Sequence, residues 1–212
     1  MGKDRRLRVA AWVGGVLACL ILIGAGIAYI VVGVNGSNEV NNQVSREQIV
    51  GSPDMTPAGI TAAAAKAGLT NVPDVPTCSV ANLKITNGDQ ARCFASYMRI
   101  HALETSGGQT YAQMGTYLTP AGTATSDKTK AAIDPQTKKP VQNAARQTWV
   151  TETALTTGLN MAYFAQQVSF FGIVVGVCCV VIGIGLGVLT VFAFGMAPWR
   201  RTGEIPSGVS PE

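Results

Sequence analysis

Two long apolar runs without a charged side chain constrain this chain more than any other feature. Residues 9–34 and residues 168–197 contain no Asp, Glu, Lys or Arg over 26 and 30 positions. About 20 apolar residues in a helix are enough to cross the roughly 30 Å hydrocarbon core of a bilayer. Each run is therefore predicted to span a membrane as one helix, and the expected fold class is an all-α membrane protein.

We favour a retained anchor over a cleaved signal peptide for the first run. Its 26 residues exceed the roughly 7 to 15 apolar residues of a signal-peptide core. No convincing small-x-small cleavage site precedes Asn35. Charged residues make up 13% of the chain, whereas soluble domains contain about 25%. This deficit is concentrated in the two apolar runs.

Basic residues close to the two runs predict how the chain is oriented. They are Lys3, Arg5, Arg6 and Arg8 before the first run, and Arg200 and Arg201 after the second. The intervening stretch has ten Lys and Arg, but none within ten residues of a run. The positive-inside rule then predicts a multi-pass plasma-membrane protein with both termini in the cytoplasm. The expected segments are a basic N-terminus (1–8), a first span (9–34), an extracytoplasmic domain (35–167), a second span (168–197) and a cytoplasmic tail (198–212).

Cysteine placement predicts one disulfide in the extracytoplasmic domain. Cys19, Cys178 and Cys179 lie inside the apolar runs, so Cys78 and Cys93 are the two left outside. An oxidising compartment favours a bond between them. A metal site is the alternative, but a chain with one His offers few further ligands.

Helix start and stop signals predict a small, mostly helical domain between the spans. Thr56 as N-cap, Pro57 at the first helical position and Gly68 after the end delimit one short helix. A second is expected from about Asp89 to Thr105. The residues expected on its apolar face are Phe94, Tyr97, Met98, His101 and Ala102.

The second half of this domain is predicted to be less regular. We expect a short helix over residues 111–118 and an exposed loop over 119–140, where Pro, Gly, Thr, Ser and Lys dominate. A helix starting near Gln142 is expected to run directly into the second span, because no proline occurs between Val141 and Pro198. Its expected inner stripe comprises Ala145, Trp149, Thr153, Thr156, Asn160 and Phe164.

Small residues four apart predict close helix packing within the membrane. The second run carries Gly172 with Gly176 and Gly183 with Gly187. The first run carries Ala10 with Gly14, Ala11 with Gly15 and Gly24 with Ala28. Such spacing lets helix backbones approach each other in lipid. We favour packing of the two spans on each other, and a homo-oligomer or another membrane subunit remains the alternative partner.

Few residues suggest chemistry. His101 and Glu104 lie one helical turn apart and form the one plausible acid–base pair, although a structural role is favoured because a site needs further partners. The chain shows no phosphate-binding loop, nucleophile elbow or zinc signature. Charge-free spans argue against transport, and the net charge of +4 forms no nucleic-acid-binding patch. We therefore expect no catalytic, cofactor-binding or metal-binding residues.

Three segments resemble a known family. They are QIVGSPDM (48–55), HALETSGGQTYAQM (101–114) and RQTWVTETALTTGLNMAYFAQQVSFF (146–171). They are similar to segments of two-pass actinobacterial membrane proteins of uncharacterised function, some of which are labelled "aromatic ring-opening dioxygenase". The resemblance implies the same topology and a cell-envelope setting. The dioxygenase label conflicts with the residues, because non-haem iron sites of that chemistry need two His and a carboxylate.

The sequence thus predicts a non-catalytic membrane protein that is an accessory, scaffold or interaction component of the actinobacterial envelope. The expected partners are the lipid bilayer and a second copy or another membrane subunit, with no nucleic acid. The alternative is an extracytoplasmic, membrane-anchored enzyme that uses His101 and Glu104. A sensor is less favoured, because tails of eight and about fifteen residues leave no room for a cytoplasmic output domain.

Overall fold

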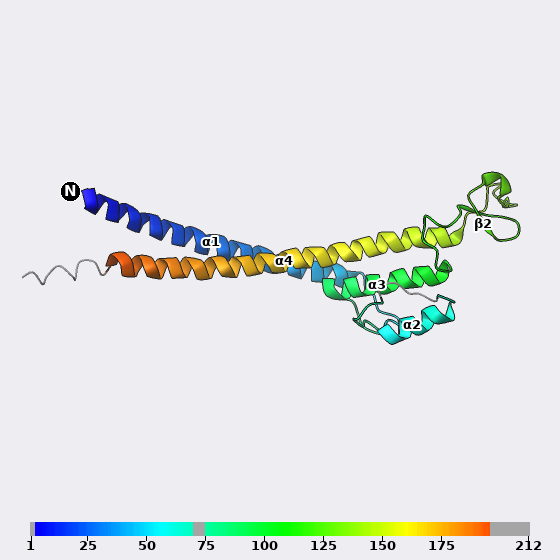
Figure 1. Ribbon diagram of the computed structural model, residues 1–212, viewed down its shortest axis with the longest axis horizontal. Helices are drawn as coiled ribbons and strands as arrows, with labels where there is room; N and C mark the ends of the chain where they lie inside the picture. Colours follow the sequence, from blue (N-terminus) through cyan, green and yellow to red (C-terminus); the bar gives the residue numbers. More distant parts are fainter. Residues whose placement is uncertain (1–2, 70–74, 196–212) are drawn as a thin grey trace, which may run out of the picture. The chain divides into compact units, whose positions relative to one another are not determined.

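The computed structural model describes residues 3–69 and 75–195 (Figure 1). Its elements are α1 (Lys3–Arg46), α2 (Pro57–Lys66), α3 (Gly88–Thr105), β1 (Tyr117–Leu118), β2 (Ala124–Thr125), η1 (Lys128–Lys130) and α4 (Ala144–Gly195). The predicted tail, with Arg200 and Arg201, and the last two residues of the second run lie outside the described residues. The chain forms two compact units. We call residues 1–35 with 168–212 the helix-pair unit, and residues 36–167 the middle unit.

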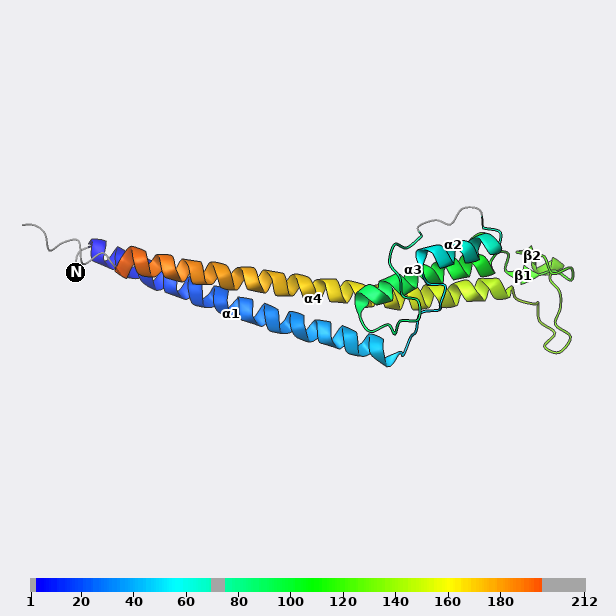
Figure 2. The same cartoon turned by 90° about the horizontal axis from the view of Figure 1, so that it is seen from below.

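The helix-pair unit consists of the first part of α1 and the last part of α4, which lie side by side (Figure 2). Both helices are long and apolar enough to cross a membrane. Only 6% of the most apolar stretch of α1 and 11% of that of α4 are buried. These helices are therefore not the buried core of the described part of the protein, and their apolar surface is available to lipid.

Glycines bring the two helices into close contact. A Cβ atom added to Gly26 or to Gly176 would lie 2.6 Å from the carbonyl oxygen of the other glycine. A Cβ on Gly33 would lie 2.6 Å from the carbonyl oxygen of Ser169, and one on Gly15 would lie 2.6 Å from Thr190 Oγ1. These pairings show that the helices run antiparallel. Backbone contact this close is the arrangement that small residues permit in lipid.

The glycines expected at the contact lie there in α4, but only some of those expected in α1 do. In α4, Cβ atoms built on Gly172, Gly176, Gly183 and Gly187 would all meet atoms of α1 within 4 Å. In α1, the expected Gly15 meets Thr190, whereas a Cβ on the expected Gly14 or Gly24 has nothing within 4 Å, so the assignment of those two to the contact was wrong. Gly26 and Gly33, which the four-residue spacing did not mark, also lie in the contact and are seven residues apart. A search for four-residue spacing misses a seam that repeats every seven residues.

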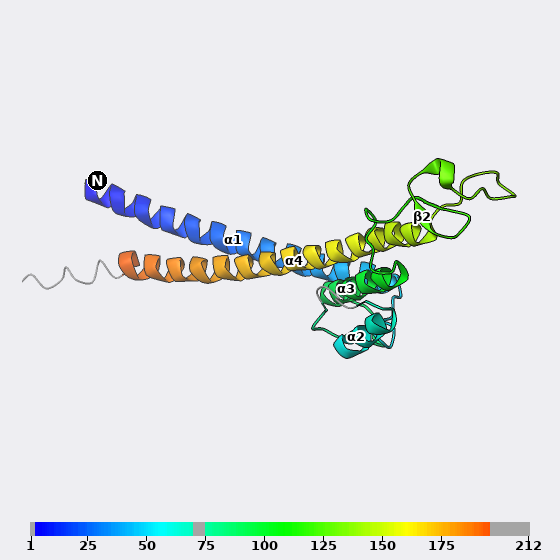
Figure 3. The ribbon, with the colours of Figure 1, turned by 45° about the vertical axis from the view of Figure 1, so that its right-hand side comes forward.

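The middle unit has a hydrophobic core around α2 and α3, which pack on each other (Figure 3). Its most completely buried large side chains are Val80, Ile60, Ile85, Tyr97 and Ile100. The predicted boundaries of α2 are confirmed. The Thr56 hydroxyl accepts a hydrogen bond from the Gly59 N–H at 3.0 Å, Pro57 opens the helix, and Gly68 follows it with φ +80°.

Helix α3 is confirmed within one residue of the predicted start, but its buried face is broader than expected. Phe94, Met98 and His101 are only half-buried. The residues buried with Tyr97 and Ala102 are mainly small or aliphatic: Ala91, Cys93, Ala95, Ile100 and Leu103. Short side chains let α3 lie close to its neighbours on several sides. The spacing of large apolar residues therefore marks only one edge of the buried face of α3 and misses the small residues that complete it.

The expected helix over residues 111–118 is wrong, because this segment leads into a small hairpin. Strands β1 and β2 pair antiparallel, with Tyr117 opposite Thr125 and Leu118 opposite Ala124. Gly122, at φ +78°, supplies the left-handed conformation that the turn needs. The rest of 119–140 is a loop, as expected, that contains the single 3₁₀ turn η1 among the described residues. Tyr and Thr near the turn favour extended backbone over helix.

Helix α4 confirms the prediction of one helix that begins near Gln142 and continues into the second apolar run. Its inner stripe was only partly correct. Trp149 and Leu159 are buried, whereas Thr153, Asn160 and Phe164 are exposed. One stripe of buried or half-buried positions along α4 repeats every 3.5 residues on average. Its members are Ala145, Trp149, Glu152, Thr156, Leu159, Tyr163 and Gln166. The predicted stripe drifted from this repeat by one residue at each of three turns.

Candidate functional site

The segment before α3 is fixed to that helix at two points. A disulfide joins Cys78 to Cys93, as the cysteine placement predicted. One turn further along α3, the Tyr97 hydroxyl donates a hydrogen bond to the Cys78 carbonyl oxygen at 2.6 Å. Burial raises the pKa of the Tyr97 phenol, which keeps the donor protonated. The segment around Cys78 is therefore held on α3 by one covalent bond and one hydrogen bond.

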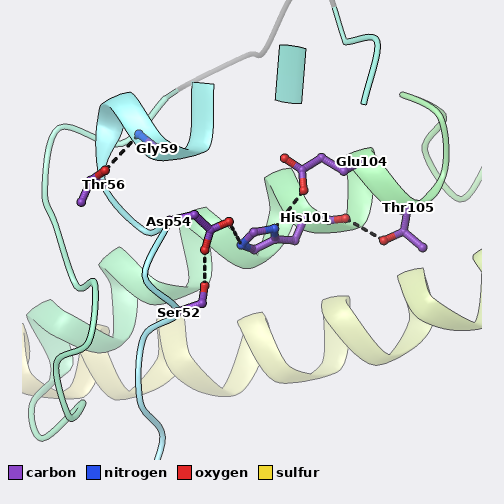
Figure 4. A network of polar contacts seen from close by, with 7 residues as sticks. All are labelled: Ser52, Asp54, Thr56, Gly59, His101, Glu104 and Thr105. Atoms are coloured by element: carbon purple, nitrogen blue, oxygen red, sulfur yellow. Dashed lines mark hydrogen bonds and ion pairs between the residues drawn. The ribbon is translucent and has the colours of Figure 1, made fainter. Parts of the chain in front are cut away.

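His101 lies between two carboxylates (Figure 4). Its Nδ1 is 2.9 Å from Glu104 Oε2, on the next turn of α3. Its Nε2 is 3.5 Å from Asp54 Oδ2, and Asp54 accepts a hydrogen bond from the Ser52 hydroxyl at 2.5 Å. Asp54 precedes the N-cap of α2. The cluster of Ser52, Asp54, His101 and Glu104, which we call the His101 network, thus connects the start of α2 to α3.

The His101 network has little capacity left for catalysis. Both imidazole nitrogens face protein carboxylates. The contact between Nε2 and Asp54 does not reach hydrogen-bond geometry, so Nε2 is buried without a hydrogen-bond partner. The second carboxylate oxygen of Glu104, Oε1, is also buried without one. A general base needs a nitrogen that can reach a substrate proton. The described residues also contain no cluster of three or more His, Cys, Asp and Glu that could hold a metal ion.

Two neighbouring pockets lie along the seam between α3 and α4 of the middle unit, and Met98 lines both. The first, about 370 Å³, is lined by Met98, His101, Ala102, Thr105, Ala144, Gln147, Thr148, Thr151 and Glu152. We call it the Glu152 pocket. The second, about 500 Å³, is lined by Gln43, Val44, Glu47, Ile49, Phe94, Met98, Ala154, Leu155, Gly158, Leu159 and Ala162. We call it the Phe94 pocket. These concave surfaces are mainly apolar, as ligand-binding sites usually are.

Polar contacts hold α3 against α4 at both ends of this seam. At the start of α3, the Gly88 N–H donates to Gln166 Oε1 at 2.5 Å, and Gln166 donates in turn to Asp89 at 3.0 Å. Beyond its end, Trp149 Nε1 donates to the Gln109 carbonyl oxygen at 2.9 Å. The Arg146 guanidinium donates to the Met114 carbonyl oxygen at 3.1 Å. These contacts hold the α3 and α4 walls of both pockets together.

These last contacts join two of the segments that carry the family resemblance. Gln109 and Met114 belong to the segment 101–114, while Trp149 and Arg146 belong to 146–171. The Arg146 guanidinium also lies over the Tyr111 ring, 3.9 Å from its centroid. The segments 101–114 and 146–171 therefore pack on each other.

Sequence reasoning missed Glu152, which is the one buried acidic residue among the described residues. A signal was present, because Glu152 lies three residues after Trp149 in a segment otherwise made of Thr and apolar residues. An acid on the inner stripe of a helix is unusual.

Comparisons of the chain with protein-family models, with curated proteins and with solved structures gave no match.

Proposed function

We propose that this chain is a two-span plasma-membrane protein that acts as a non-catalytic accessory or interaction component of the actinobacterial cell envelope. In this proposal both termini are cytoplasmic and the middle unit is an extracytoplasmic domain. Two long apolar helices support the spans, and the Cys78–Cys93 disulfide supports an oxidising compartment for the middle unit. The segments that resemble actinobacterial two-pass proteins support the setting.

The observation that carries the interaction role is the preformed apolar surface of the middle unit. The Phe94 pocket is walled by Val44, Phe94, Leu155 and Leu159, and Leu155 remains 51% exposed. Farther along α4, Met161 is 58% and Phe164 60% exposed. An apolar surface that stays open on a cross-linked unit is a typical docking site for another protein. A membrane subunit beside the chain is the partner that we propose.

The alternative, an enzyme that uses His101 and Glu104, has one observation in its favour. Their side chains are 2.9 Å apart, as in a base held by a carboxylate. However, Asp54 lies on the other side of the imidazole, so both ring nitrogens face protein carboxylates. A structural role for the His101 network is the better-supported reading.

Site-specific photocrosslinking in native membranes tests the docking proposal. A benzophenone amino acid would replace Leu155, in the Phe94 pocket, and in a matched control Leu83, which is 48% exposed and lines neither pocket. We expect the Leu155 position to give one discrete protein adduct that the Leu83 position does not give. The same adducts from both positions, or none from Leu155, would contradict a docking role for this surface.

A further inference from the structure

We propose that the Glu152 pocket binds an alkylammonium group, with Glu152 as its counter-ion. The pocket would do so whether or not the Phe94 pocket docks another protein.

Glu152 is buried without a counter-charge. Only 4% of the residue is exposed. Its hydrogen bond is a long one, accepted at Oε2 from the hydroxyl of Thr153 at 3.3 Å. None of the ion pairs among the described residues includes Glu152. Removing a carboxylate from water is costly unless a positive group compensates it.

The nearby bases are already engaged elsewhere. His101 lines the same pocket, but its two ring nitrogens face Glu104 and Asp54. The Arg99 guanidinium lies over the ring of Trp149, 5.3 Å from its centroid. The lining of the pocket thus holds one carboxylate, that of Glu152, and no Lys or Arg. A ligand that brings one positive charge would complete this arrangement.

The walls of the pocket select the kind of cation. Met98, Ala102 and Ala144 provide apolar surface, and Thr105, Thr148 and Thr151 provide hydroxyl groups. An alkyl chain would contact the apolar wall, while its ammonium group donates to the Glu152 carboxylate and to hydroxyl oxygens. A bare metal ion would need three or more protein ligands, and no such cluster occurs in the described part of the chain.

Two natural sources share this chemistry, namely a free alkylamine and a lysine side chain of a peptide. Binding would be measured by calorimetry on the full chain in nanodiscs. The probes are n-butylamine and the peptide acetyl-Gly-Lys-Gly-amide. Their matched controls are n-butanol and the same peptide with an Nε-acetylated lysine, because both keep the alkyl chain and remove the charge. Binding of only one amine probe would identify the source.

Three variants localise the binding. Glu152→Gln keeps the size of the side chain and should weaken amine binding at least about tenfold, since a hydrogen bond to a charged group is worth about 1.5–3 kcal/mol. Thr148→Leu, which fills the pocket and keeps Glu152, should weaken it as well. Glu39→Gln removes an exposed carboxylate that lines neither pocket and should leave the affinity unchanged.

Several outcomes would overturn the proposal. They are amine probes that bind no better than their uncharged controls, an affinity that Glu152→Gln leaves intact, or equal losses in Glu152→Gln and Glu39→Gln. Thermal unfolding of each variant shows whether it is folded. If Glu152→Gln fails to fold, the comparison of Thr148→Leu with the parent chain decides the same question. Failure here would leave the crosslinking test of the Phe94 pocket unaffected.

Discussion

Removal of the Cys78–Cys93 disulfide should destabilise the middle unit by an amount that follows from the loop it closes. The two cysteines are 15 residues apart in sequence. In the chain-entropy model, a closed loop of about 15 residues lowers the entropy of the unfolded chain enough to stabilise the fold by about 3 kcal/mol at 25 °C. The double variant Cys78→Ala/Cys93→Ala should lose at least this amount, because Cys93 also lies in the core.

Urea titration with pulse proteolysis would measure this loss on the full chain in nanodiscs. With a urea dependence of about 1–3 kcal/mol per molar, a loss of 3 kcal/mol lowers the midpoint for the middle unit by about 1–3 M. Cys178→Ala removes an exposed free thiol of the helix-pair unit and is the control, with no expected shift. Reducing agent should lower the midpoint of the parent chain and of the control, but not that of the double variant. A double variant as stable as its parent would refute the reasoning.

Three further changes test other parts of the structure. Gly176→Ala should weaken association of the two long helices by about 1–3 kcal/mol relative to Gly185→Ala, because a Cβ at 176 meets backbone and one at 185 meets nothing within 4 Å. Energy transfer between dyes on the two helices during detergent titration would report this, and equal effects would contradict the glycine seam. His101→Gln should cost at most about 1 kcal/mol in thermal unfolding, and a larger loss would contradict a modest structural role. Hydrogen bonds from the backbone N–H groups of Thr137 and Gln136 lower the pKa of Asp134. This turn is therefore stabilised above the ordinary carboxyl pKa and loses that stability as pH falls through the lowered value. Asp134→Asn should abolish the resulting pH dependence of amide exchange, and an unchanged dependence would contradict the assignment.

The features that could be predicted from sequence are those set by local chemistry. Two uncharged runs of sufficient length can hardly form anything but long apolar helices. The N-cap hydroxyl of Thr56, the proline after it and Gly68 act within a few residues of each other, so the limits of α2 followed directly. The disulfide followed by elimination, since Cys78 and Cys93 are the two cysteines outside the runs.

The features that were missed depend on what lies across the fold. Tyr117 pairs with Thr125 only once the turn at Gly122 has formed, and the segment alone has no strong strand pattern. Gly26 meets Gly176 because the two helices repeat every seven residues along their contact. Glu152 became a candidate binding residue only when its burial and its absence from the ion pairs of the described residues were known. Each case depends on tertiary partners that a local pattern does not contain.

Accessibility of single cysteines in intact cells tests most directly the proposal that the middle unit is an extracytoplasmic domain on a two-span anchor. Ser126→Cys places a thiol on the exposed loop after β2, and Ser210→Cys places one in the C-terminal tail. The parent chain, which lacks both, gives the background. A membrane-impermeant maleimide should label the cysteine at 126 in intact cells and the one at 210 only after lysis. Labelling at 210 in intact cells, with 126 protected, would contradict the account.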